Sequence, residues 1–134
     1  MELTAMKEQL TQLERELHAY GHAMGCLSFD AATVAPSGSS EARGLTLSFL
    51  SEKHYAALVN PQVRELLDGL WSRRDELDAA TLRRTQLLRE DLDELTRIPV
   101  EEYAAYARIT NESSERWRAA KATGDYAVFE PLLS

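Results

Sequence analysis

The chain has 134 residues, of which 44% are hydrophobic, 28% charged and only 7% aromatic, with 4 prolines and 6 glycines. This composition excludes a disordered chain and favours helices over a turn-rich β architecture. The 22 acidic residues outnumber the 15 basic ones, and the net charge of −7 repels a phosphate backbone, so nucleic acid is not expected as a partner.

The first predicted element is a helix over about residues 2–24. Its apolar residues recur at alternating steps of three and four, which places them on one stripe of a helix. Gly21 and Gly25 weaken the end of this helix, and the Ser-rich run of residues 26–40 that contains Pro36 and Gly38 is expected to be a loop. The stripe consists of Leu3, Met6, Leu10, Leu13, Leu17, Tyr20 and Met24.

Two further helices are predicted over about 41–58 and 61–75. Ser40 is the expected cap of the first, and Asn60 followed by Pro61 is a strong start signal for the second. Apolar residues expected to face inward are Leu45, Phe49 and Leu50, and then Val63, Leu66, Leu67, Leu70 and Trp71.

The second half of the chain predicts helices over about 79–97, 99–123 and 125–133. Asp78 is the expected cap of the first, and Gly124 ends the second. The first should bury Leu82, Leu88, Leu92, Leu95 and Ile98, and the second should present an inward stripe of Tyr103, Tyr106, Thr110, Ser113, Trp117 and Ala120. The small, hydroxyl-bearing middle of that stripe favours a close approach by a neighbouring element.

These elements predict an all-α fold of five or six helices in an antiparallel bundle-like arrangement, with residues 1–134 forming a single helical domain or fragment. The single cysteine excludes an internal disulfide and a cysteine-rich zinc site. No apolar run approaches the roughly 20 residues that a membrane span needs, and the charged N-terminus is unlike a secretory signal. We therefore expect a soluble, cytoplasmic chain without a membrane partner.

Two short features could carry chemistry and are weighed against structural roles. His18 and His22 have the i, i+4 spacing of an HExxH zinc motif, but Ala19 stands where the catalytic Glu would be, which favours two surface histidines. Cys26 has no His or Arg beside it to activate it, which favours a buried, inert thiol. The residues alone therefore predict no catalytic site and no metal site.

Two blocks of sequence carry a recognisable pattern. The first block is Leu27-Ser-Phe-Asp30, Thr33, Pro36-Ser-Gly38, Arg43, His54 and Asn60-Pro-Gln-Val-Arg-Glu-Leu-Leu67; the second is Arg97-Ile-Pro-Val-Glu-Glu-Tyr103, Trp117-Arg-Ala-Ala-Lys121 and Gly124-Asp-Tyr-Ala-Val-Phe-Glu-Pro-Leu-Leu133. In their order and spacing these blocks resemble the carboxypeptidase Taq family of zinc metallocarboxypeptidases, which remove C-terminal residues from peptides. Phe29 and Ala31 depart from the family pattern, which usually has Trp and a polar residue there.

The resemblance implies that this chain is the N-terminal helical part of a larger metallopeptidase, the part that helps to wall its deep substrate groove. The HExxH zinc helix, the later Glu ligand and the substrate-binding Arg and His motifs of the family have no matching position here. Zinc is therefore implied for the full-length family and not for this chain, and a peptide substrate only for a full-length enzyme. The chain alone is expected to be inactive.

Three residues of the first block are candidates for a structural or groove-facing role. Asp30 and Arg43 are expected to form an ion pair that ties the loop to the next helix. His54 is expected to be structural, and a groove-facing role for Asp30, Arg43 or His54 is the alternative. The expected partner is the missing C-terminal catalytic portion or a second copy of the chain. The alternative function is a free-standing helical module for interaction or oligomerisation.

Overall fold

The computed structural model describes residues 1–133, apart from the side chains of residues 100, 104 and 107. Every regular element in this part of the chain is helical, so the predicted all-α class is confirmed. The elements in chain order are α1 (Leu3–Thr33), α2 (Ser40–Leu58), α3 (Pro61–Ser72), the 3₁₀ turn η1 (Arg74–Glu76), α4 (Ala79–Thr96), α5 (Val100–Thr123), and the 3₁₀ turns η2 (Tyr126–Val128) and η3 (Glu130–Leu132).

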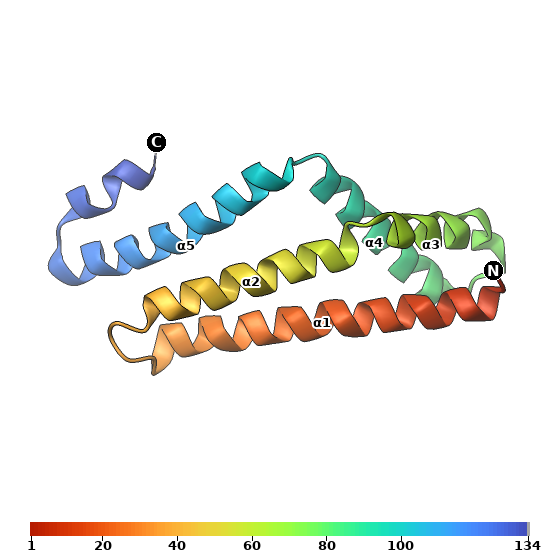
Figure 1. Ribbon diagram of the computed structural model, residues 1–134, viewed down its shortest axis with the longest axis horizontal. Coiled ribbons are helices and arrows are strands. Elements are labelled where there is room, and N and C mark those ends of the chain that lie inside the picture. The colour runs from red at the N-terminus through yellow and green to blue at the C-terminus, as the bar shows by residue number, and fades with distance from the viewer. Residues whose placement is uncertain (134) are drawn as a thin grey trace.

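The arrangement is elongated, and it is built on three long helices. α1 and α2 form an antiparallel hairpin, and α5 runs back along α2 on the side away from α1 (Figure 1). α3 and α4 form a shorter hairpin beside the N-terminal half of α1, and η2 and η3 fold back on the end of α5 (Figure 1). None of the helices in residues 1–133 is long and apolar enough to cross a membrane.

The first helix is longer than its sequence predicts. α1 continues through Gly21 and Gly25 to Thr33, where the backbone N–H groups of Val34 and Ala35 donate to the carbonyl oxygen of Asp30. Each glycine costs about 1 kcal/mol of helix propensity, and packing along α2 offsets this cost: the α1–α2 contact is the most extensive between any two elements and includes Ser51 Oγ donating to Met24 Sδ at 3.4 Å. The predicted helix end at residue 24 is therefore wrong, and of the predicted loop over 26–40 only residues 34–39, which include Pro36 and Gly38, are confirmed.

The actual loop between α1 and α2 is short and turns at a glycine. Gly38 has a φ of 89°, in the left-handed region that glycine adopts without strain. Ser39, not Ser40, precedes the helix, and its hydroxyl donates to the carbonyl of Pro36 at 2.7 Å instead of capping α2. The predicted cap at Ser40 is wrong because that residue is already the first of α2.

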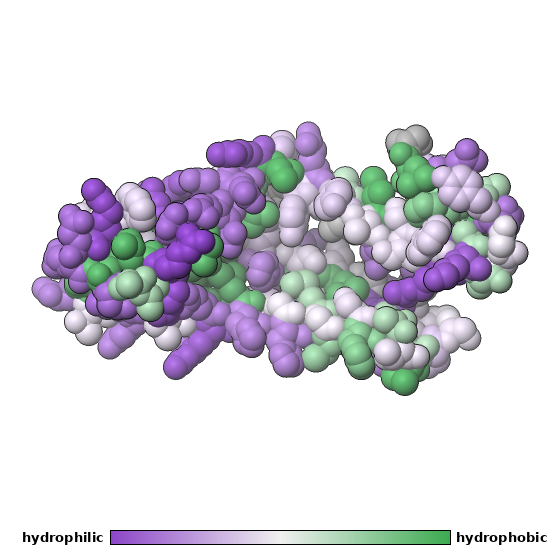
Figure 2. Space-filling model, turned by 180° about the vertical axis from the view of Figure 1, so that it is seen from behind, coloured by the Kyte–Doolittle hydropathy of each residue, from purple (hydrophilic) through white to green (hydrophobic). Residues whose placement is uncertain are grey.

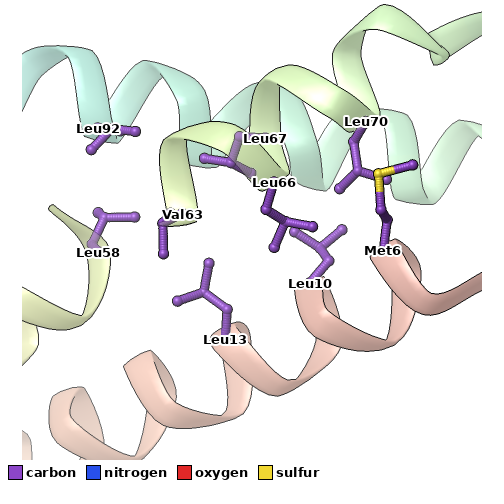
Figure 3. Close-up of a cluster of buried hydrophobic side chains, with 9 residues drawn as sticks. All are labelled: Met6, Leu10, Leu13, Leu58, Val63, Leu66, Leu67, Leu70 and Leu92. Carbon is purple, nitrogen blue, oxygen red and sulfur yellow. The ribbon is translucent and has the colours of Figure 1, made fainter. Parts of the chain in front are cut away.

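The hydrophobic core lies at one end of the molecule, where α1, α3, α4 and the last turn of α2 meet. Figure 3 shows side chains from these four helices pointing toward one another. The residues predicted as inward on α1 and α3 supply most of this cluster, because their three-and-four spacing keeps them on a single face. The buried cluster consists of Met6, Leu10, Leu13, Leu58, Val63, Leu66, Leu67, Leu70 and Leu92.

Away from this core, several residues that were predicted to face inward are exposed. Leu45 and Phe49 of α2 are 70% and 58% exposed, and Tyr106 and Trp117 of α5 are 69% and 49% exposed. The space-filling view from behind shows apolar residues, coloured green, on the surface at the end opposite the core (Figure 2). The α5 stripe is covered only in part, at Tyr103 by Tyr55 of α2 and at Trp117 by Phe129. The prediction failed at the exposed positions because, among the described residues, packing is too sparse there to bury these side chains.

A charged contact joins α1 to α4 beside the core. The guanidinium of Arg84 donates to both carboxylate oxygens of Glu14, and also to the hydroxyl of Thr11 at 3.2 Å. Both charged side chains are partly shielded from water, 38% and 29% exposed. Such a two-point contact holds α4 in register on α1 more effectively than a single surface ion pair.

The starts of α3 and α4 follow the predicted caps. The Asn60 side chain accepts a hydrogen bond from the backbone N–H of Val63 at 3.0 Å, and Pro61 occupies the first helical position. The carboxylate of Asp78 accepts from the backbone N–H of Thr81 at 3.0 Å and from the Thr81 hydroxyl at 2.7 Å. Both predicted caps are confirmed. The expected last helix, over 125–133, is instead the two 3₁₀ turns, since Pro131 has no N–H to continue a helix.

The cap at Asp78 makes stability depend on pH. Its hydrogen bonds from Thr81 lower the pKa of the Asp78 carboxyl from 3.8 to about 2. Because the pKa is lower in the folded state than in the unfolded one, the carboxylate stabilises the fold fully above the unfolded value, and this stabilisation is lost as the pH falls toward 2. We expect the stability difference between the wild type and Asp78→Ala to shrink steadily between about pH 5 and pH 2, as measured by urea unfolding. The exposed, non-capping Asp91, replaced by alanine, should show no such convergence.

Candidate functional site

The three candidate residues lie on the α1–α2 hairpin and do not converge. Asp30 is exposed on the last turn of α1, Arg43 is on the first turns of α2, and His54 is half-buried near the end of α2. Arg43 and His54 are separated by about 16 Å along the helix axis, given the rise of 1.5 Å per residue. No single small ligand could contact both through short side chains, so these residues form no compact site.

The predicted ion pair between Asp30 and Arg43 is wrong. Arg43 instead donates to the hydroxyl of Ser39 at 3.0 Å and to the carboxylate of Glu115, on α5, at 3.4 Å. The Arg43 side chain is only 12% exposed. Arg43 therefore ties α2 to α5 and to the loop before α2, rather than to the end of α1.

This ion pair belongs to a polar and aromatic seam between α2 and α5 that the sequence did not predict. Next to Arg43, a Cβ atom placed on Gly44 would lie only 3.2 Å from Asn111 Nδ2, so the absence of a side chain allows a close approach. Further along, the rings of Tyr55 and Tyr103 lie with their centroids 5.1 Å apart. The small middle of the α5 stripe was the available signal for a close neighbour, but it did not identify α2.

The contacts between α2 and α5 are expected to stabilise the packing of α5. Replacing Arg43 by alanine removes the long-range ion pair, and we expect backbone amides of α5 to exchange with solvent about fivefold faster, since a partly buried charge pair contributes on the order of 1 kcal/mol. Hydrogen exchange read by mass spectrometry measures this directly. Arg116→Ala is the matched control, because Arg116 is exposed and its ion pair, with Glu112, lies within α5. Equal acceleration in both variants would show that Arg43 does not hold α5.

The motifs on α1 are both exposed. The rings of His18 and His22 lie on the solvent-facing side with their centroids 6.0 Å apart and their planes at 56°. Cys26 is exposed, so the predicted burial of its thiol is wrong. The reason is the extension of α1 beyond residue 24, which continues the helix through Cys26 and turns its side chain to solvent.

Two hollows on the described surface contain none of the candidate residues. One shallow depression of about 650 Å³ follows the outer side of α1 between Thr4 and Arg15, and another of about 460 Å³ lies between Met1, Met6 and α3. In the described residues, no group of three or more His, Cys, Asp and Glu side chains is placed to hold a metal ion. The residues present therefore do not fit a catalytic zinc, which needs three protein ligands and an open position.

Comparison with known proteins identifies relatives over almost the whole chain. A family model described as carboxypeptidase Taq (M32) metallopeptidase matches residues 9–134. Carboxypeptidase 1 of Bacillus subtilis (strain 168) is 27% identical over 133 residues, which are 99% of this chain and 26% of that protein. The chain thus spans about a quarter of the length of this relative.

Solved structures show the same relationship in three dimensions. The BsuCP crystal structure matches 97% of this chain and 26% of its own length with a TM-score of 0.88, at 30% identity. Metallocarboxypeptidase 1 of Trypanosoma cruzi matches 96% of this chain and 26% of its own length with a TM-score of 0.77; at 21% identity this likeness concerns the fold alone. The helical arrangement described above is therefore that of one part of a larger protein architecture.

Proposed function

Because the chain belongs to the carboxypeptidase Taq (M32) metallopeptidase family, we propose that it is the N-terminal helical segment of a zinc-dependent carboxypeptidase, an enzyme that releases C-terminal residues from peptides. The observation that carries this proposal is the match of 97% of the chain to 26% of a solved relative with a TM-score of 0.88. A segment that has the same fold as its relatives over its full length is suited to occupy the same position in a complete enzyme.

In this role the segment contributes shape rather than chemistry. Catalytic zinc would supply a polarised carbonyl and an activated water in the whole enzyme, but the described residues of this chain bring no three His, Cys, Asp or Glu side chains together to hold it. The long α1–α2 hairpin and α5 would form one wall of the substrate groove. Peptide binding and turnover are then properties of the assembled enzyme, and this chain alone should release no C-terminal residue.

The exposed apolar residues support the same proposal. Leu45, Phe49, Tyr106 and Trp117 are large, and each is between 49% and 70% exposed. An isolated helical domain does not usually present so many on neighbouring elements. The relatives are about four times as long as this chain, and the remaining three quarters of their fold is what we propose to cover this surface.

A chimeric enzyme tests the proposal. The quarter of B. subtilis Carboxypeptidase 1 that matches this chain is replaced by the present sequence, and release of the C-terminal residue from a peptide is followed with and without a zinc chelator. We expect chelator-sensitive activity from the chimera, and none from the 134-residue chain supplied with zinc. Activity of the chain alone would contradict the proposal.

A second measurement covers the case of a chimera that does not fold. Sequencing the gene beyond the codon for Ser134 shows whether the open frame continues into an HExxH motif, which supports the proposal. A stop codon directly after Ser134 favours the other candidate, a free-standing helical module that binds a partner through the same exposed residues.

A further inference from the structure

The pair His18 and His22 is not used by the proposed function. Both side chains are exposed on the middle of α1, which forms one long outer edge of the molecule (Figure 1). Their rings contact each other with centroids 6.0 Å apart. In the described part of the chain neither imidazole makes a hydrogen bond or an ion pair, so their ring nitrogens are available to a ligand.

The surface around the pair is open. Gly21 and Gly25 lie on the same side of α1 as the two histidines, by the helical period. A Cβ atom placed on either glycine would meet no atom within 4 Å. A hydrated ion could therefore approach the pair without displacing any part of the protein.

The helix holds the two rings at a separation that suits chelation. Residues four apart on a helix have their Cβ atoms about 6 Å apart, and the backbone between them is continuous α-helix. Two nitrogens bound to one tetrahedral zinc ion lie about 3.3 Å from each other, from a Zn–N distance of about 2.0–2.1 Å. Rings whose centroids are 6.0 Å apart reach this separation by rotating about side-chain bonds, and nothing blocks the rotation at an exposed position.

We propose that His18 and His22 chelate a borderline divalent cation of the zinc class through one nitrogen of each ring, with water in the remaining positions. Imidazole is a preferred ligand for such ions, and the net charge of −7 favours a bound cation. This is a two-ligand surface site, because no third His, Cys, Asp or Glu in residues 1–133 joins the pair. Ala19 stands where an HExxH motif has its general-base Glu, so the proposed role of the pair is binding and not catalysis.

Titration calorimetry with Zn²⁺ tests the site on the 134-residue chain. We expect one Zn²⁺ per chain, and a loss of affinity of at least about tenfold in His18→Ala and in His22→Ala, since losing even an outer partner of a metal ligand costs that much. His54→Ala should bind as the wild type does, because His54 lies on α2. The imidazole signals of His18 and His22, and not that of His54, should shift in NMR spectra on adding Zn²⁺.

A matched variant tests whether Zn²⁺ binding depends on the geometry of the histidine pair or only on the number of histidines. The double variant Ala19→His/His22→Ala keeps the same number of histidines on exposed positions of α1, but its two rings point about 100° apart around the helix. We expect it to bind Zn²⁺ as weakly as His22→Ala. Wild-type affinity in this variant, loss of binding in Cys26→Ser or His54→Ala, or no binding by the wild type would each overturn the proposal.

Discussion

Replacing Leu67 by alanine is expected to lower the free energy of unfolding by about 3 kcal/mol, the middle of the range for a leucine removed from a close-packed core. Leu67 is fully buried, at 0% exposed, and it lies where α3 meets α1 and α4. A domain of this size is stabilised by only about 5–15 kcal/mol in total. The variant should therefore unfold at a clearly lower urea concentration, with the transition followed by circular dichroism.

Leu45→Ala is the matched control for this experiment. The same atoms are removed from a helix, and leucine and alanine have nearly equal helix propensity, but Leu45 is 70% exposed. Its effect should stay within about 0.5 kcal/mol, as for other surface substitutions. If the two variants lost the same stability, the division between a buried core at one end and an uncovered surface at the other would be wrong.

The sequence predicted the core well wherever a helix packs on partners within this chain. Leu10 and Leu67 were predicted from their spacing alone, and both are completely buried. Cap signals were equally informative at Asn60 and Asp78, because a cap depends on residues only three positions apart. Local geometry and period are enough for such features.

The wrong predictions concern features that depend on residues far away in the sequence. The apolar character of Leu45 and Phe49 indicates that something covers them, but not which part of which chain does so. Arg43 was paired with Asp30, the other charged residue singled out in the same block of sequence, whereas its partner Glu115 is 72 positions away. The end of α1 was missed because glycine propensity is a weak local preference, and the long packing contact with α2 overrides it.

The candidate site shows the same limit. Its residues were selected by resemblance, and resemblance to part of an enzyme identifies a location in a fold rather than a function for each side chain. Arg43 now has a structural account as the tie between α2 and α5. Asp30 is exposed on α1, and a groove-facing role for it is still a prediction that the chimeric enzyme can test by Asp30→Ala.

The uncovered surface leads to the second large effect, which concerns association. At increasing concentration we expect the chain to form a broad distribution of masses in light scattering, because exposed apolar side chains associate without one defined geometry. The double variant Leu45→Glu/Phe49→Glu should shift this distribution toward monomer. Burial of each such side chain contributes about 1.5–3 kcal/mol, so contacts that use both should weaken roughly a hundredfold or more.

A charge-matched control variant and the distribution of masses in light scattering together distinguish the possible roles of the exposed apolar surface. Ser48→Glu/Ala56→Glu adds the same charge at exposed positions of α2 without removing a large apolar side chain, and it should shift the masses less. A single sharp dimer would instead indicate an evolved symmetric interface and favour the free-standing module. A monomer at every concentration would contradict the surface argument itself. A broad distribution that Leu45→Glu/Phe49→Glu abolishes is the result expected of a groove wall whose packing partner is the rest of a peptidase.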